Sequence, residues 1–194
     1  MKIILASQSP RRKALIEQMG IKDCEIINSL VKEEMDSNLE VQEQVEKLSF
    51  EKAKKVFNET TGERIVVGAD TVVEKDNQIY GKPKDKEEAR NMIRKFKNST
   101  VNIITAMTVF IQNKEQMIQK VNSTTTEIYI KDMTEKEIEK WLNTGKAMDK
   151  AGAFSIQDEF SMYIEKIVGD YNSAIGLSTS KLYDIIYQYG GNEL

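Results

Sequence analysis

The chain has 194 residues, of which 40% are hydrophobic and 30% charged, proportions that are typical of a folded globular protein. Its net charge of −3 argues against a general nucleic-acid binder, which would need a basic face. It has no histidine and one cysteine, Cys24, which excludes Ser-His-Asp and Cys-His catalysis, histidine metal sites and internal disulfides.

The apolar segments are too short for targeting or membrane insertion. The opening KIILA is shorter than a signal-peptide core, and no stretch approaches the roughly 18 apolar residues of a membrane span. A lone cysteine is compatible with a reducing compartment, so we expect a cytoplasmic protein without a membrane partner. At this length we expect one domain over residues 1–194, with two lobes.

Strands and helices are predicted to alternate in the first half of the chain. Ser9 can cap a helix that begins at Pro10, and Gly20 marks its end. After the strand that ends at 73, KDNQ predicts a turn back through IYGKP. The predicted strands are 2–6, 24–28 and 64–73, and the predicted helices are 10–19 and about 41–57.

The second half predicts a hairpin between helices. Asp85 with Glu88, and Thr134 with Glu137, have the spacing of capping boxes. The expected helices are 85–96, 134–145 and 182–189, the strands are 101–111, 117–131 and 162–168, and 149–157 is a loop or a strand. Because a hairpin and β-α alternation occur together, the predicted fold class is α/β with a mixed sheet.

Two arginines stand at an unfavourable position. Arg11 and Arg12 fall in the first turn after Pro10, where the helix dipole disfavours a cation by about 0.3–1 kcal/mol. Either they are solvated surface side chains, or strand, turn and helix start form a cradle for a phosphate. The segment lacks the glycines and the GK[ST] ending of a P-loop, so a phosphate site is compatible with it but a P-loop is not.

Two further charged residues lie in apolar surroundings. Asp70 interrupts IVVGADTVV, where it is either a turn or bulge residue after Gly68, or a general base or metal ligand with Thr71 beside it. Lys52 shares a helical ridge with apolar neighbours. It either extends to solvent or points into a cleft that contains an anion.

An acidic segment at 32–36 is the last group of candidate functional residues. Such runs are usually solvated, but without histidine any catalytic metal must bind oxygen ligands, which favours Mg²⁺ or Mn²⁺. Glu33, Glu34 and Asp70 are the candidate ligands, and Lys82 adds a cation before the helix at 85. The residues themselves therefore indicate metal-assisted hydrolysis of a phosphorylated small molecule, and no more.

Six segments, in order and spacing, resemble the Maf family of nucleotide pyrophosphatases. The resemblance spans residues 3 to about 186 and is to the branch that cleaves dTTP and UTP. It implies a two-lobed α/β fold with a central cleft, related to ITPase-like enzymes, and hydrolysis of a nucleoside triphosphate to the monophosphate and pyrophosphate with a divalent metal. The segments are LASQSPRRKAL, EKAKKV, GADTVV, GKPKDKEEA, DKAGAFSIQ and IVGDYNSAIGL.

The resemblance also implies roles for individual residues. Asp70 matches the family's proton acceptor. Gln157 would read the base, because its amide can both accept from and donate to a pyrimidine edge. The residues that match the polar cleft are Ser7, Arg12, Glu33, Lys52 and Lys82, and those that match the positions distinguishing the pyrimidine branch are Arg11, Thr71 and Gln157.

A second function is compatible with the same resemblance. The family is linked to inhibition of septum formation, so a regulator that binds nucleotide without turnover is the alternative to an enzyme. The intact GADT segment and the cationic residues favour the enzyme. A homodimer is common in the family.

Overall fold

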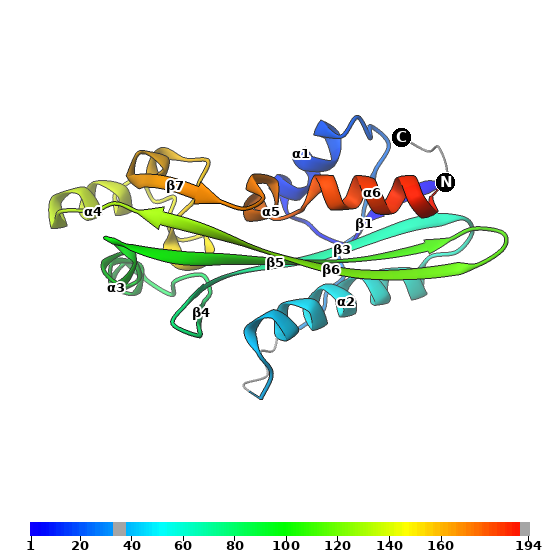
Figure 1. Ribbon diagram of the computed structural model, residues 1–194, viewed down its shortest axis with the longest axis horizontal. Coiled ribbons are helices and arrows are strands. Elements are labelled where there is room, and N and C mark those ends of the chain that lie inside the picture. Colours follow the sequence, from blue (N-terminus) through cyan, green and yellow to red (C-terminus); the bar gives the residue numbers. More distant parts are fainter. Residues whose placement is uncertain (33–37, 191–194) are drawn as a thin grey trace. The chain divides into compact units, whose positions relative to one another are not determined.

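A computed structural model describes residues 1–32 and 38–190 of the chain (Figure 1). The strands are β1 (Lys2–Leu5), β2 (Glu25–Ile26), β3 (Arg64–Lys75), β4 (Gln78–Tyr80), β5 (Ser99–Gln112), β6 (Met117–Ile130) and β7 (Ile164–Val168). Within the described residues they form one seven-stranded sheet in the order β2-β1-β3-β5-β6-β7, with β4 paired to β3. β1 is parallel to both neighbours, whereas β4 and β7 pair antiparallel, which confirms the predicted mixed α/β sheet.

The predicted helices are present, and three short ones were not predicted. The helices are α1 (Pro10–Gln18), α2 (Val41–Glu59), α3 (Lys86–Phe96), α4 (Glu135–Leu142), α5 (Tyr171–Ile175) and α6 (Thr179–Tyr189), with 3₁₀ turns η1 (Ala151–Ala153) and η2 (Glu159–Tyr163). The turn η1 lies in the segment expected as a loop or a strand, and η2 takes the first two residues of the strand predicted at 162–168. No helix within residues 1–32 and 38–190 is long and apolar enough to cross a membrane.

The two predicted capping boxes have different outcomes. Thr134 and Glu137 are reciprocal, because Glu137 N donates to Thr134 Oγ1 at 3.3 Å and Thr134 N donates to Glu137 Oε2 at 2.8 Å. Asp85 accepts from Glu88 N at 2.8 Å, but the Glu88 carboxylate accepts from Lys84 N instead of returning to Asp85. The reciprocal half of that second prediction is therefore wrong, although the helix begins where it was expected.

The chain divides into two compact units. The first comprises Met1–Thr71, Thr105–Thr124 and Gly176–Leu194, and the second comprises Val72–Ile104 and Thr125–Ile175. β3, β5 and β6 are long enough to contribute residues to both units.

In the first unit, helices cover both faces of the strands. α1 and α6 lie on one side and α2 lies on the other (Figure 1). The ring of Phe57 stacks on that of Phe110 at 4.9 Å between centroids. The apolar cluster beneath α2 consists of Ile4, Ala6, Ala53, Val56, Val66 and Phe110.

The second unit has a core rich in aromatic side chains. Trp141 is fully buried, and its Nε1 donates to the carbonyl oxygen of Ala153 at 2.8 Å, so the indole N–H does not remain unsatisfied. Large members of this core are Phe96, Trp141, Phe154, Phe160 and Tyr163.

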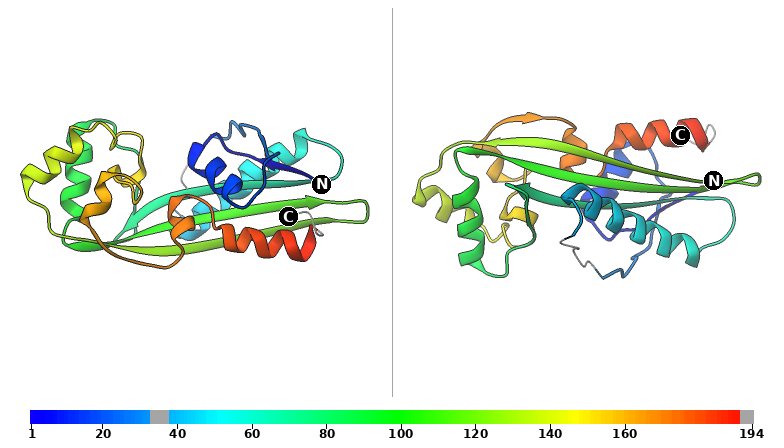
Figure 2. Two further views of the ribbon diagram at one scale, coloured as in Figure 1. Left: turned by 90° about the horizontal axis from the view of Figure 1, so that it is seen from above. Right: turned by 60° about the horizontal axis from the view of Figure 1, so that its bottom comes forward.

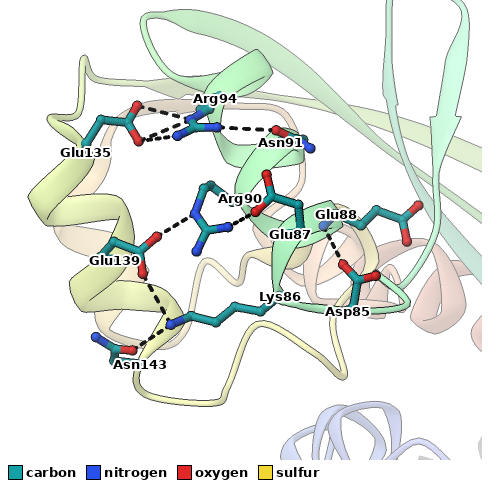
Figure 3. Close-up of polar contacts among 10 residues, drawn as sticks. All are labelled: Asp85, Lys86, Glu87, Glu88, Arg90, Asn91, Arg94, Glu135, Glu139 and Asn143. Carbon is teal, nitrogen blue, oxygen red and sulfur yellow. Dashed lines mark hydrogen bonds and ion pairs between the residues drawn. The ribbon is translucent and has the colours of Figure 1, made fainter.

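α3 and α4 lie side by side (Figure 2) and are joined by ion pairs on their exposed faces (Figure 3). Arg90 Nε donates to Glu139 Oε1 at 2.5 Å, and Arg94 Nη2 donates to Glu135 Oε2 at 2.7 Å. The hydrogen bond from Arg90 lowers the pKa of Glu139, and the one from Arg94 lowers the pKa of Glu135. Both carboxylates therefore stabilise the folded state only while they are ionised.

We expect Glu139→Gln to lower the free energy of unfolding slightly at neutral pH, because it removes the partner of Arg90. Since the folded-state pKa lies below the ordinary value of 4.5, this contribution is present above that value and disappears as the pH falls through the folded-state pKa. Urea unfolding of both proteins over this pH range measures it. Glu165→Gln, at an exposed position of β7, is the matched control, and an equal effect of the two variants at neutral pH would contradict the prediction.

Candidate functional site

The turn between β1 and α1 lies where a parallel strand ends. β1 pairs with β3 as far as Leu5 and Val67, and β3 continues beyond that point. Ser9 caps α1 as predicted, because its side chain accepts a hydrogen bond from Arg12 N at 3.4 Å. The first turn of α1 is thus next to the carboxyl end of β1, the position at which open α/β sheets commonly bind ligands.

The guanidinium of Arg12 is held by contacts from three segments of the chain. These contacts fix the plane of the guanidinium through tertiary structure, so Arg12 is not a solvated surface side chain. A cationic fork of fixed orientation suits the oxygen atoms of a phosphate. Arg12 donates from Nε to Gly176 O at 2.9 Å, from Nη1 to Ser7 Oγ at 3.1 Å and from Nη2 to Thr71 Oγ1 at 3.1 Å.

The neighbouring arginine is less constrained. Arg11 is half-buried in the same turn, and within the described parts of the chain no hydrogen bond or ion pair engages its side chain. Its charge adds to that of Arg12 at the helix end where an anion is favoured. The structure therefore brings Ser7, Arg12 and Thr71 together, with Arg11 in the adjacent position.

A second group of predicted residues meets on the other side of β3. Lys52 Nζ donates to Asp70 Oδ1 at 2.6 Å, and the two residues are only 7% and 6% exposed. Asp70 lies inside the continuous strand β3, so the alternative that placed it in a turn is wrong. Lys52 does not extend to solvent, because its ammonium group is directed to a buried carboxylate.

This buried ion pair constrains both partners. Each charge alone would be costly to bury, and removing one partner of such a pair typically destabilises a protein by about 3–5 kcal/mol. Lys52 occupies Oδ1 of Asp70, whereas among the described residues no group donates to Oδ2. Since an ionised carboxylate only accepts, Oδ2 is the atom of Asp70 that can accept a proton from water or bind a cation.

The absence of a side chain at Gly68 determines how closely α2 approaches β3. A Cβ at this position would lie 2.5 Å from Ala53 N and 2.6 Å from Ser49 O, both of which are backbone atoms of α2. Lys52 directly precedes Ala53, and Asp70 lies two residues after Gly68. The close contact therefore sets the distance over which Lys52 reaches Asp70.

Asp70 and Thr71, which are adjacent in β3, contact Lys52 and Arg12 respectively. Successive side chains of a strand point to opposite faces, so Asp70 faces α2 and Thr71 faces the side of α1. Figure 1 shows α1 and α2 on opposite sides of the strands of this unit. A single peptide bond thus separates the residue that binds Lys52 from the residue that binds Arg12.

Of the three predicted metal-ligating carboxylates, Asp70 lies within the described residues. Glu33 and Glu34, the other predicted ligands, lie outside the described residues, and within residues 1–32 and 38–190 no three acidic or cysteine side chains gather as a metal cluster. Mg²⁺ is commonly held by one or two carboxylates together with phosphate oxygens of a substrate. The Oδ2 atom of Asp70 is compatible with such a site.

The other two predicted residues belong to the second compact unit. Lys82 follows β4 and Gln157 follows η1, and both are exposed. Their loops are joined, because Gly152 N donates to Gly81 O at 3.0 Å. The roles of these two side chains stay predictions.

Two residues around Arg12 were not predicted from local sequence. Gly176 supplies a carbonyl oxygen, and Thr105 of β5 places Oγ1 2.9 Å from Thr71 Oγ1. The available signal for Thr105 was a hydroxyl in the apolar run IITAMTVFI, because a buried hydroxyl needs a hydrogen-bond partner. That signal does not identify the partner.

Comparisons with known proteins agree on one family. Residues 2–189 match the family model of Maf, described as Maf-like protein. A relative named dTTP/UTP pyrophosphatase in Alkaliphilus metalliredigens (strain QYMF) is 38% identical over 97% of this chain and 96% of its own length. One of the same name in Thermoanaerobacter sp. (strain X514) is 39% identical over 96% of this chain and 95% of its own.

One solved structure shows a weaker similarity. It is that of a nucleoside-triphosphatase / dITP/XTP pyrophosphatase from Mycobacterium abscessus. It aligns with a TM-score of 0.42 at 14% identity, over 76% of this chain and 95% of that one.

We expect Gly68→Ala to lower the free energy of unfolding by about 1–3 kcal/mol, because the added methyl group collides with the backbone of α2. Urea unfolding monitored by circular dichroism measures this loss. Gly81→Ala is the matched control, since a Cβ there meets no atom within 4 Å. Equal stability of the two variants would show that the close approach does not constrain α2.

Proposed function

The chain belongs to the Maf family, and on that premise we propose that it is a nucleoside triphosphate pyrophosphatase that hydrolyses dTTP and UTP. The products are the nucleoside monophosphate and pyrophosphate, with water as the second substrate. The observation that supports this most strongly is the similarity, over nearly the whole chain, to relatives named dTTP/UTP pyrophosphatase. Asp70, a buried carboxylate, and Arg12, an oriented guanidinium, are groups of the kinds that this reaction needs.

Asp70 acts as the general base in this proposal. As the oxygen of water bonds to phosphorus and the anhydride P–O bond breaks, the proton of the water passes to Oδ2 of Asp70. Lys52 keeps Oδ1 in place through the 2.6 Å hydrogen bond, so the carboxylate has a defined orientation. Lys52 thus takes part in the proposed reaction by binding Asp70 directly.

The phosphate groups are bound by the cationic residues. Arg12 presents a guanidinium whose orientation is already set by Ser7, Thr71 and Gly176 before substrate arrives. Binding groups that are fixed in advance lose little entropy when they engage the charge of the transition state. Ser7, Lys52 and Lys82 are the further phosphate-binding residues of the proposal, with the ammonium group of Lys52 also bound to Asp70.

A divalent cation, Mg²⁺ or Mn²⁺, completes the site. Asp70 and the substrate phosphates would hold it, with Glu33 as a further ligand, and when bound it would neutralise charge on the phosphate oxygens. The oxygen character of these ligands matches the preference of both cations.

Three residues are proposed to select a pyrimidine base. The exposed amide of Gln157 can accept from the N–H of uracil or thymine and donate to a neighbouring carbonyl. Arg11 and Thr71 are the accompanying specificity residues. Thr71 already accepts a hydrogen bond from Arg12, so its effect on substrate choice includes an effect on that arginine.

We expect Asp70→Asn to lower kcat for dTTP and UTP by about 10²–10⁴-fold, because the amide cannot take a proton from water. Its carbonyl oxygen can still accept the hydrogen bond from Lys52, so binding of dTTP is retained. Pyrophosphate release measures turnover, calorimetry measures binding, and thermal melts verify folding. Asp184→Asn, at an exposed position of α6, is the matched control.

The outcomes of this experiment are distinct. Turnover of Asp70→Asn at the wild-type rate would remove Asp70 as the base. Binding of dTTP by the wild type without pyrophosphate release would contradict the enzyme hypothesis and favour the alternative, a regulator that binds nucleotide without turnover. Addition of EDTA is expected to abolish activity and Mg²⁺ or Mn²⁺ to restore it, and full activity in EDTA would remove the metal from the proposal.

We expect Gln157→Glu to lower kcat/KM for dTTP and UTP by roughly 5- to 150-fold, because a carboxylate facing a base carbonyl leaves two acceptors opposed, at about 1–3 kcal/mol. Metal dependence should not change. Pyrophosphate release from a panel of nucleoside triphosphates measures the effect, with Gln188→Glu at an exposed position of α6 as control. An unchanged preference for dTTP and UTP would show that Gln157 does not read the base.

A further inference from the structure

The buried hydroxyl of Thr105 has a position that packing alone does not explain. Thr105 lies in β5 between apolar neighbours and is 3% exposed. Its Oγ1 is 2.9 Å from Oγ1 of Thr71, which is half-buried in β3. Thr105, in the interior of β5, is thereby connected to Thr71, which contacts Arg12.

Thr71 is able to bind Thr105 and Arg12 simultaneously. A hydroxyl has one hydrogen and two acceptor sites, and Arg12 Nη2 donates to Thr71 Oγ1 at 3.1 Å. Thr71 can accept from Arg12 and either donate to Thr105 or accept from it. Under both assignments the direction of the Arg12 hydrogen bond is the same.

The rotamer of Thr71 is the feature that Thr105 controls. The Cβ of threonine bears both a hydroxyl and a methyl group, so rotation about χ1 exchanges the atom that faces the guanidinium. With Thr105 as partner, the rotamer that directs Oγ1 into this network is favoured. When the Thr105 hydroxyl is absent, there is no hydrogen bond between the two threonines to lose. A rotamer that turns the methyl group of Thr71 towards Arg12 is then no longer disfavoured by that loss.

We propose that Thr105 is a positioning residue for the triphosphate, which acts through Thr71 to set the orientation of the Arg12 guanidinium. This inference rests on the proposed function, because it assigns Arg12 to the phosphates. Ser7 and Gly176 O accept from the other two nitrogen atoms of this rigid planar guanidinium, so the contact through Thr71 is one of three that together fix its orientation.

The chain contains a matched control for a merely structural role. Thr108 lies in the same strand, is completely buried and has Oγ1 2.8 Å from Ser49 Oγ. Its side chain points to the opposite face of β5 from that of Thr105. Thr108→Val therefore removes the same kind of buried hydrogen bond without affecting the contacts of Arg12, and Ser49 retains its bond to Glu46 O.

The test compares Thr105→Val, Thr105→Ser and Thr108→Val by pyrophosphate release from dTTP. We expect Thr105→Val to lower kcat/KM about tenfold, mainly through KM, as loss of one hydrogen bond that orients a charged group would do. Thr105→Ser, which keeps the hydroxyl, should return it to within about threefold of the wild type. Thr108→Val should leave kcat/KM within about twofold of the wild type.

A double-mutant cycle decides whether the effect passes through the arginine. In an Arg12→Lys background, Thr105→Val is expected to cause no further loss, because the fork that it orients is absent. A full tenfold loss in that background, no rescue by serine, or an equal effect of Thr108→Val would each overturn the proposal.

A binding measurement separates this inference from the proposed function. In the Asp70→Asn background, calorimetry gives the Kd of dTTP without turnover, and Thr105→Val is expected to raise that Kd about tenfold. An unchanged Kd would overturn the role of Thr105 even if the wild type hydrolyses dTTP. Failure of the wild type to release pyrophosphate would reject the enzyme while the Kd still tests Thr105.

Discussion

The close packing of α2 on β3 at Gly68 is the constraint on which the site depends. Because Gly68 has no side chain, the backbone of α2 approaches closely enough for Lys52 to reach a carboxylate in the middle of an apolar strand. The pair in turn helps to hold the helix in register, since a shift of α2 would separate two buried charges of opposite sign. Local backbone packing therefore makes a buried Asp70 tolerable.

β3 distributes the chemistry between its two faces. Asp70 and Thr71 are neighbours in sequence, yet one engages α2 and the other engages α1. A strand in the interior of a sheet holds side chains more precisely than a loop does. Any movement of β3 would therefore alter the contacts of Asp70 and of Arg12 together, which ties the two proposed roles to one element.

Local signals were sufficient for much of the fold and for several of the candidate site residues. Ser9 and the pair of Thr134 and Glu137 cap helices as their spacing predicts, and Asp70 and Lys52 were identified because a charge in an apolar run needs an explanation.

The pairing of these residues was not predictable, because it depends on distances between elements far apart in the sequence. Thr105 illustrates this limit, since its partner Thr71 follows only from the register of β5 against β3. α5 is five residues long, too short for a helical period to show.

The two cations next to β3 have different electrostatic roles. Lys52 is paired with the carboxylate of Asp70, and Arg12 is oriented by hydrogen bonds to a carbonyl oxygen and two hydroxyls. At the start of α1 that positive charge is disfavoured by about 0.3–1 kcal/mol, and a phosphate bound there would reverse the sign of the interaction with the helix dipole. In the proposed function, the unfavourable position of the arginine would thus become a contribution to substrate binding.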